Sequence, residues 1–226
     1  MRPFIHLALA AAMMSVATTS PVGAQEDPTA YMVTYIEVVP TAKNQGATII
    51  KALAEASRKE AGVTRFEVFE RTAPAGQFLI LEVWKDKPAM EAHGNGAAAK
   101  DYRAKMQPIL LAPIDDRTSI ATSVAPATLA PGAVIAATHV DVAPPNRDKT
   151  VVLLKAFADT VRKSPGNARY DVLQQTARTN HFTVVEVWKD QAAADAHELA
   201  AHTKEYRKDV GAMLGALYDQ RWYKAM

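Results

Sequence analysis

The stretch Glu82-Val83-Trp84-Lys85-Asp86, followed by Ala89, Ala92 and His93, decides the fold because it occurs twice. It returns as Glu186-Val187-Trp188-Lys189-Asp190, followed by Ala193, Ala196 and His197. Each residue of the motif recurs 104 positions later, since 186 minus 82 and 197 minus 93 both give 104. Laid over one another at this shift without a gap, residues 31–120 and 135–224 are identical at roughly 30 of about 90 positions. A repeat of this length indicates a duplicated domain, because solenoid repeats are only about 20–50 residues long.

The duplication divides the chain into two expected domains, residues 31–122 and residues 134–226. Residues 123–133 between them are rich in Pro and Ala and carry no charge, which is typical of a semi-extended linker.

Residues 1–24 have the pattern of a cleaved secretory signal. Arg2 gives a positive start, an apolar run follows, and Val22-Gly23-Ala24 offers small residues for cleavage. The apolar run is too short for a comfortable membrane span. We therefore expect a bacterial periplasmic or secreted protein with no membrane association after cleavage, and the absence of cysteine favours the bacterial route.

The composition excludes several classes of function. A formal charge of +2 over 226 residues gives no reason to expect a nucleic-acid partner. The absence of cysteine removes thiolate nucleophiles, Cys-ligated zinc and iron–sulfur clusters.

The hydrophobic pattern changes period several times within each copy. In copy one it predicts strands at 32–39, 65–71, 77–85 and 114–120, a helix at 42–61 that ends at Gly62, and a helix begun by Asp86. Gly94-Asn95-Gly96 predicts a break before a further helix, whereas Glu198-Leu199-Ala200 predicts no break in copy two.

This order predicts an α+β fold made of two ferredoxin-like domains. Both faces of the strand Phe78–Trp84 are apolar. Because helices cover only one face of such a sheet, we expect the sheet of the other copy to cover the second, which gives an intrachain pseudo-dimer.

The strand motif Glu82–Asp86 and the helix motif Ala89, Ala92, His93, repeated in copy two, resemble the antibiotic biosynthesis monooxygenase (ABM) domain, to which the small quinol monooxygenases belong. The resemblance covers nearly all of the chain after residue 24. It implies a dimeric α/β barrel, which we expect this chain to form with its own second half. It also implies oxidation of a small quinol or phenolic aromatic substrate by O2, with no cofactor and no metal. The alternative is a non-catalytic ligand-binding or interaction module of the same barrel superfamily, and further self-association stays open.

The candidate catalytic bases are His93 and His197, since histidine titrates near neutral pH and the reaction needs a phenolate. Each could instead cap its helix or bond a neighbouring backbone group.

The other candidate site residues are proposed to bind the substrate. Trp84 and Trp188 are either pocket walls or core, and Tyr102 and Tyr206 present the same choice. Glu82 and Glu186 lie among apolar neighbours, where an unpaired acid is costly. Arg65 and Arg169 on the adjacent strand are their expected partners, in a structural ion pair or in an anion-holding role.

The copies differ at several candidate positions. Tyr35 on the first strand is matched by His139, and further histidines and aromatic residues enter copy two: His181, His202, Trp222 and Tyr223. This enrichment favours copy two as the working site.

Three other classes rank lower. Haem-degrading relatives use an asparagine on the first strand, and neither copy has one there. His197, Glu198 and His202 lack tight ligand spacing, so no metal site is expected. The chain has no Gly-x-Ser-x-Gly elbow for a serine hydrolase.

Overall fold

A computed structural model describes residues 27–126 and 129–226. The expected signal sequence at 1–24 lies outside the described residues, and so do two residues of the expected linker. In the described part of the chain, no helix is both long and apolar enough to cross a membrane.

Each copy contains four strands and three α-helices in the same order. Copy one consists of β1 (Ala30–Glu37), η1 (Pro40–Ala42), α1 (Lys43–Ser57), β2 (Val63–Arg71), β3 (Gln77–Trp84), α2 (Lys87–Gly94), α3 (Ala97–Met106), η2 (Gln107–Ile109) and β4 (Asp115–Ser123). Copy two consists of β5 (Val134–Asp141), η3 (Pro144–Asn146), α4 (Arg147–Val161), β6 (Asn167–Gln175), β7 (His181–Trp188), α5 (Gln191–Leu199), α6 (Ala201–Gly211) and β8 (Asp219–Ala225).

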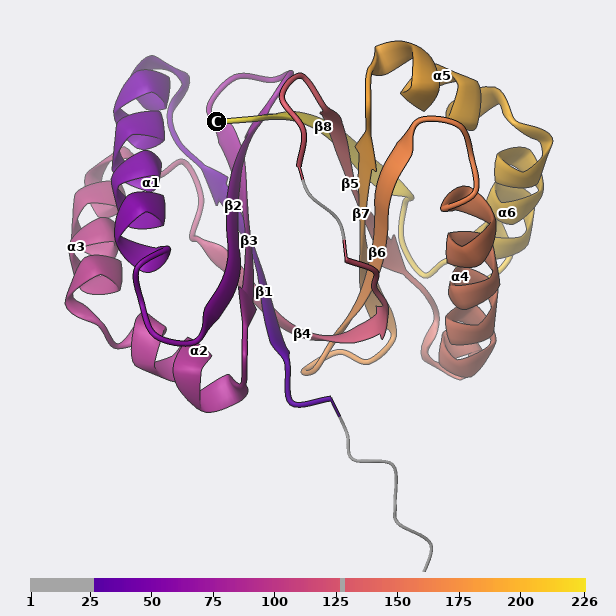
Figure 1. Ribbon diagram of the computed structural model, residues 1–226, viewed down its shortest axis with the longest axis horizontal. Helices are drawn as coiled ribbons and strands as arrows, with labels where there is room; N and C mark the ends of the chain where they lie inside the picture. The colour runs from indigo at the N-terminus through magenta and orange to yellow at the C-terminus, as the bar shows by residue number, and fades with distance from the viewer. Residues whose placement is uncertain (1–26, 127–128) are drawn as a thin grey trace, which may run out of the picture.

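The eight strands close into one barrel in the order β1-β3-β2-β8-β5-β7-β6-β4. The helices of copy one cover one side of the barrel and those of copy two the other (Figure 1). The predicted fold class, two ferredoxin-like domains that form a dimeric α/β barrel within one chain, is confirmed.

The last strand of each copy joins the two halves. Strand β4 pairs through Tyr31↔Ser119 with β1 of its own copy and through Ile120↔Gln174 with β6 of the other. Strand β8 likewise pairs with β5 and with β2. The strands β4 and β8 therefore cover edges that each half alone would expose.

Alternate residues on each strand point to two different cores. On β3, Phe78, Ile80 and Trp84 pack against the helices of copy one, whereas Leu79, Leu81 and Val83 face the barrel interior with residues of both copies. Each half thus has its own helix-covered core, and the shared interior lies between them.

The repeated motif has a structural role at the start of α2 and α5. The carboxylates of Asp86 and Asp190 accept hydrogen bonds from the backbone N–H groups of Ala89 and Ala193, both at 2.8 Å. Gly62, at φ 89°, lies so near that an added Cβ would stand 2.9 Å from the Ala89 side chain. The small alanine and the glycine in the turn between α1 and β2 are therefore required by the same close approach. The first helix was predicted to run to residue 61 but ends at Ser57.

One helix prediction is wrong. The helical stretch of copy two is broken at Ala200, which has extended backbone angles of φ −63° and ψ 147° between α5 and α6. No glycine is needed there because these angles are open to any residue, so the break left no signal in the sequence.

Candidate functional site

In copy one the motif residues gather between β3 and the helices, outside the barrel interior. The indole N–H of Trp84 donates to Glu82 Oε2 at 2.8 Å, and the same oxygen lies 3.7 Å from His93 Nε2. The His93 ring stacks on Trp84 with their centroids 4.8 Å apart. All three side chains are buried. His93 is therefore held by its neighbours and does not point outward as a helix cap.

Glu60, which the sequence did not single out, completes this cluster. His93 Nδ1 lies 3.1 Å from both carboxylate oxygens of Glu60. A carboxylate only accepts hydrogen bonds, so Nδ1 is the nitrogen that donates in this contact. Glu60 stands in the turn after α1, far from His93 in the chain, and Ser164 takes its place in copy two. Only that difference between the copies marked it in the sequence.

Burial changes the acidity of Glu82. Its enclosed position raises the pKa of this carboxyl, and the attraction of His93 and the hydrogen bond from Trp84 oppose the rise. The neutral form of Glu82 is thus favoured more than it would be in water.

A small cavity of about 40 Å³ lies against Glu82 and His93. Its lining includes Tyr102, whose buried hydroxyl finds no hydrogen-bond partner among the described residues. A space of this size holds a few water molecules or a diatomic gas and is too small for an aromatic ring.

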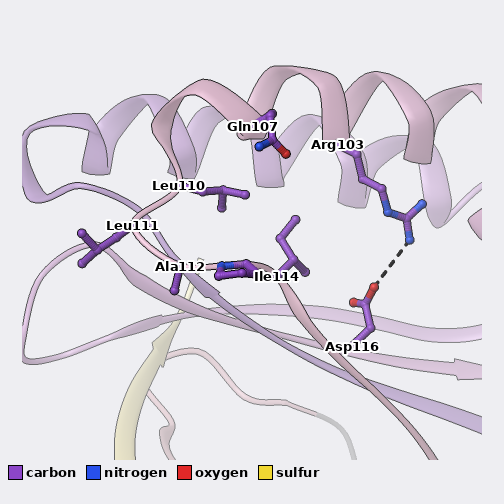
Figure 2. Close-up of a pocket in the computed structure, with 8 residues that line it drawn as sticks. Arg103, Gln107, Leu110, Leu111, Ala112, Ile114 and Asp116 are labelled. Atoms are coloured by element: carbon purple, nitrogen blue, oxygen red, sulfur yellow. Dashed lines mark ion pairs between the residues drawn. The ribbon is translucent and has the colours of Figure 1, made fainter.

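A larger groove of about 460 Å³ opens beside the cavity, lined by Gln107, Leu110, Leu111, Ala112, Pro113 and Ile114. Figure 2 shows Arg103 from α3 and Asp116 from β4 pointing toward one another at the end of this groove. Their charged atoms are 3.6 Å apart. Both residues also line the inner cavity, so this ion pair stands between the groove and His93.

Copy two repeats the core of this arrangement. Trp188 Nε1 donates to Glu186 Oε2 at 3.1 Å, and that oxygen lies 3.6 Å from His197 Nε2. The His197 ring stacks on Trp188 at 4.6 Å. The Nδ1 atom of His197 lies 3.2 Å from the hydroxyl oxygen of Thr203, whereas the Nδ1 atom of His93 faces the carboxylate of Glu60.

Several aromatic side chains lie around His197. Phe157, the counterpart of Leu53, stacks on Tyr206 at 3.9 Å and lies 5.9 Å from His197. Tyr218 replaces Ile114 and packs edge-on against Tyr206. Phe157 and Tyr218 are thus larger than Leu53 and Ile114 at the same positions of copy one. Of the residues whose enrichment favoured copy two, His202 lies beside this cluster, with its ring centre 5.7 Å from that of His197.

Burial also dominates the acidity of the copy-two pair. It raises the pKa of Glu186 to about 7 and lowers that of His197 to about 4. Both groups are thus pushed toward their neutral forms.

The predicted pairing of Arg65 with Glu82 and of Arg169 with Glu186 is wrong. The register sets Arg65 beside Val83 and Phe66 beside Glu82, so Arg65 points to the opposite face of the sheet. There Arg65 Nη2 reaches Asp171 at 3.1 Å, and Arg169 holds both oxygens of Glu67 at 2.8 and 2.9 Å. These ion pairs cross the barrel interior between the copies.

Tyr35 and His139 also face the barrel interior, away from the Trp–His clusters. The guanidinium groups of Arg117 and Arg221 lie 4.5 and 5.5 Å from the Tyr35 ring centre. Arg117 donates to His139 Nδ1 at 2.9 Å. Of the predicted site residues, the structure therefore brings His, Trp, Glu and Tyr of each helix-covered core together and places the arginines, Tyr35 and His139 elsewhere.

Comparison with known proteins agrees with this architecture. The family model described as "Antibiotic biosynthesis monooxygenase" matches residues 29–105 and again residues 133–209, together more than half of the chain. A curated relative, "Putative monooxygenase YcnE" of Bacillus subtilis (strain 168), is 33% identical over 81 residues, which are 36% of this chain and 85% of the relative.

Solved structures share the whole tandem fold. A protein of Fusobacterium nucleatum, titled a putative monooxygenase, aligns with a TM-score of 0.78 at 18% identity and covers 89% of this chain and 94% of its own. An anthrone oxidase-like protein aligns with a TM-score of 0.69 at 14% identity, covering 89% and 92%. At these identities the likeness concerns the fold alone.

Proposed function

Because the chain belongs to the antibiotic biosynthesis monooxygenase family, we propose that it oxidises a small quinol or phenolic aromatic compound with O2. We further propose that copy one carries the reaction, and that the protein acts after export, in the periplasm or outside the cell. The observation that carries the proposal is the set Glu60–His93–Glu82 beside a cavity, because copy two has Thr203 and not a carboxylate at the histidine Nδ1 atom.

His93 is the proposed base. In this proposal Nε2 takes the phenolic proton while Nδ1 donates to Glu60, whose negative charge stabilises the imidazolium that forms. Glu60 is a positioning residue in this scheme, since it acts through His93.

Arg103 and Asp116 are proposed to control entry. The groove lined by the residues in Figure 2 has a volume that suffices for an aromatic ring, whereas the inner cavity admits only a small group. Substrate would place its ring in the groove and its hydroxyl group inward, with the Arg103 guanidinium near the developing phenolate. The inner cavity then suits O2, to which the phenolate passes one electron before the two radicals combine.

Oxygen uptake with a panel of hydroquinones and phenols tests this proposal. Full-length protein, treated with a chelator and checked by absorption for bound flavin or haem, is expected to consume O2 with at least one hydroquinone. A panel in which no compound raises oxygen uptake above the protein-free rate contradicts it. Saturable binding of the same compounds without uptake would assign the chain to the alternative, a non-catalytic ligand-binding module.

A further inference from the structure

A second cluster lies where β5 ends and β7 begins, at one end of the barrel. His139 and Asp141 are two residues apart on β5, so their side chains share a face, and Asp141 pairs with His181 of β7 in the strand register. One ligand atom from each of the three side chains lies within 4.8 Å of the other two. We propose that His139, Asp141 and His181 bind one divalent first-row transition-metal ion.

The donor set points to this class of ion. Two imidazole nitrogens and one carboxylate oxygen suit Zn²⁺, Cu²⁺, Ni²⁺ or Co²⁺, whereas Mg²⁺ and Ca²⁺ prefer oxygen ligands alone. His181 Nε2 is already 3.1 Å from Asp141 Oδ1, and the two imidazole rings are 5.4 Å apart. Ligand atoms around a bound zinc ion lie roughly 3–4 Å from one another, so the three groups need to close by about an ångström.

The position is rigid and accessible. The backbones of two paired strands hold the three residues, and barrel strands constrain their side chains more tightly than loops do. The Asp141 and His181 side chains keep 21% and 14% of their exposure, so an ion can enter from solvent and retain water as a further ligand.

The neighbouring charges allow a cation here. Arg117 pairs with Asp115 at 2.6 Å and Arg221 with Asp219 at 2.7 Å, so both of these guanidinium groups have a carboxylate of their own. Arg178 is a further positive charge near His181. Asp141 adds one further negative charge. Arg117 donates to His139 Nδ1 and must give up that contact if the ion takes this nitrogen, but its bond to Asp115 remains.

Copy one provides an internal comparison. At the equivalent positions it has Tyr35, Glu37 and Gln77, so it keeps a carboxylate but lacks both imidazoles. The proposed site therefore belongs to copy two alone and is separate from the His93 cluster. The three ligands come from two strands without a short ligand motif, which is why the sequence predicted no metal.

Calorimetric titration with Zn²⁺ tests the site in full-length protein purified without a histidine tag and freed of metal by a chelator. Wild type is expected to bind one ion per chain, with Mg²⁺ as a probe that does not bind. His181→Gln and His139→Tyr restore the residues of copy one. Removing a residue that merely orients a ligand commonly costs about 10- to 100-fold in metal affinity, so each variant is expected to lose at least that much. His202→Ala also restores a copy-one residue but should bind like wild type.

The proposal is overturned if wild type binds no Zn²⁺, or if His181→Gln and His139→Tyr bind as tightly as wild type. Unfolding of a variant would not obscure the answer, because Cu²⁺ bound to wild type reports its ligands by electron paramagnetic resonance. Splitting from two imidazole nitrogens is expected. A spectrum without nitrogen splitting overturns the assignment.

Discussion

At the scale of single residues, two clusters of the same composition differ in what faces the histidine Nδ1 atom. Glu60 faces His93, whereas Thr203 faces His197. A carboxylate stabilises a positive imidazolium and a hydroxyl does so far less, which is why His93 and not His197 is the proposed base.

Replacing Glu60 by Gln should lower kcat for quinol oxidation by at least about 10-fold, because His93 loses the charge that stabilises its protonated form. The KM for the quinol should change little, because Glu60 lines neither the groove nor the inner cavity. Glu55→Gln, at an exposed position on the preceding helix, is the matched control and should leave kcat unchanged. An unaltered kcat in Glu60→Gln would show that Glu60 does not act through His93.

The Glu186 carboxyl should make the stability of the chain depend on pH. Its folded pKa of about 7 lies above the ordinary value of 4.5, so the folded chain keeps this proton more tightly than the unfolded chain. The resulting stabilisation is complete below pH 4.5 and is lost as pH rises through 7. Its full size is about 3 kcal/mol.

Urea unfolding of wild type and Glu186→Gln between pH 4.5 and 8 measures this effect. The stability of wild type relative to the variant is expected to fall across that range. His197, whose lowered pKa acts in the opposite direction, is present in both proteins, so its contribution largely cancels. A constant difference would mean that burial does not shift Glu186.

At the scale of secondary-structure elements, the two copies are held together by crossed strands and crossed ion pairs. Strands β4 and β8 each pair with both halves, and side chains of β2 and β6 form ion pairs with one another across the barrel interior. The Arg169 side chain is only 1% exposed, so its charge depends on Glu67 and Asp171 for compensation.

Arg169→Met should destabilise the protein by about 3–5 kcal/mol, because Glu67 and Asp171 would be left with a single arginine in the interior. Chemical denaturation measures the change. The control Arg147→Met removes one partner of an exposed pair and should cost no more than about 0.5 kcal/mol. If the two variants were equally stable, the interior ion pairs of Arg169 would contribute no more to stability than an ion pair on the surface.

At the scale of the whole molecule, the duplication made the fold predictable and the working site hard to predict. The repeat of Glu82–His93, the strand–helix order and the two apolar faces of β3 were sufficient for the pseudo-dimer. They were also sufficient to predict that Trp84, Glu82 and His93 lie close together. Glu82 and Trp84 share one face of a strand, and His93 lies on the helix that follows it.

The remaining site depended on contacts between distant segments. The β2–β3 register turned Arg65 away from Glu82, and it is set by the bulge between Val63 and Arg65, which the alternating pattern does not reveal. Glu60 reaches His93 only through folding. The histidines that favoured copy two do not form one pocket, because His139 and His181 lie together at one end of the barrel and His202 lies beside His197. Residue type alone could not show which of them share a site.

The most direct test of the account compares oxygen uptake by His93→Asn and His197→Asn with a hydroquinone that wild type oxidises. Asn removes the base while it keeps a polar side chain. We expect kcat/KM to fall by roughly 100-fold or more in His93→Asn, the usual contribution of a general base, and to stay within about 3-fold of wild type in His197→Asn. Equal turnover by His93→Asn and wild type, or a large loss in His197→Asn alone, would contradict the assignment of the reaction to copy one.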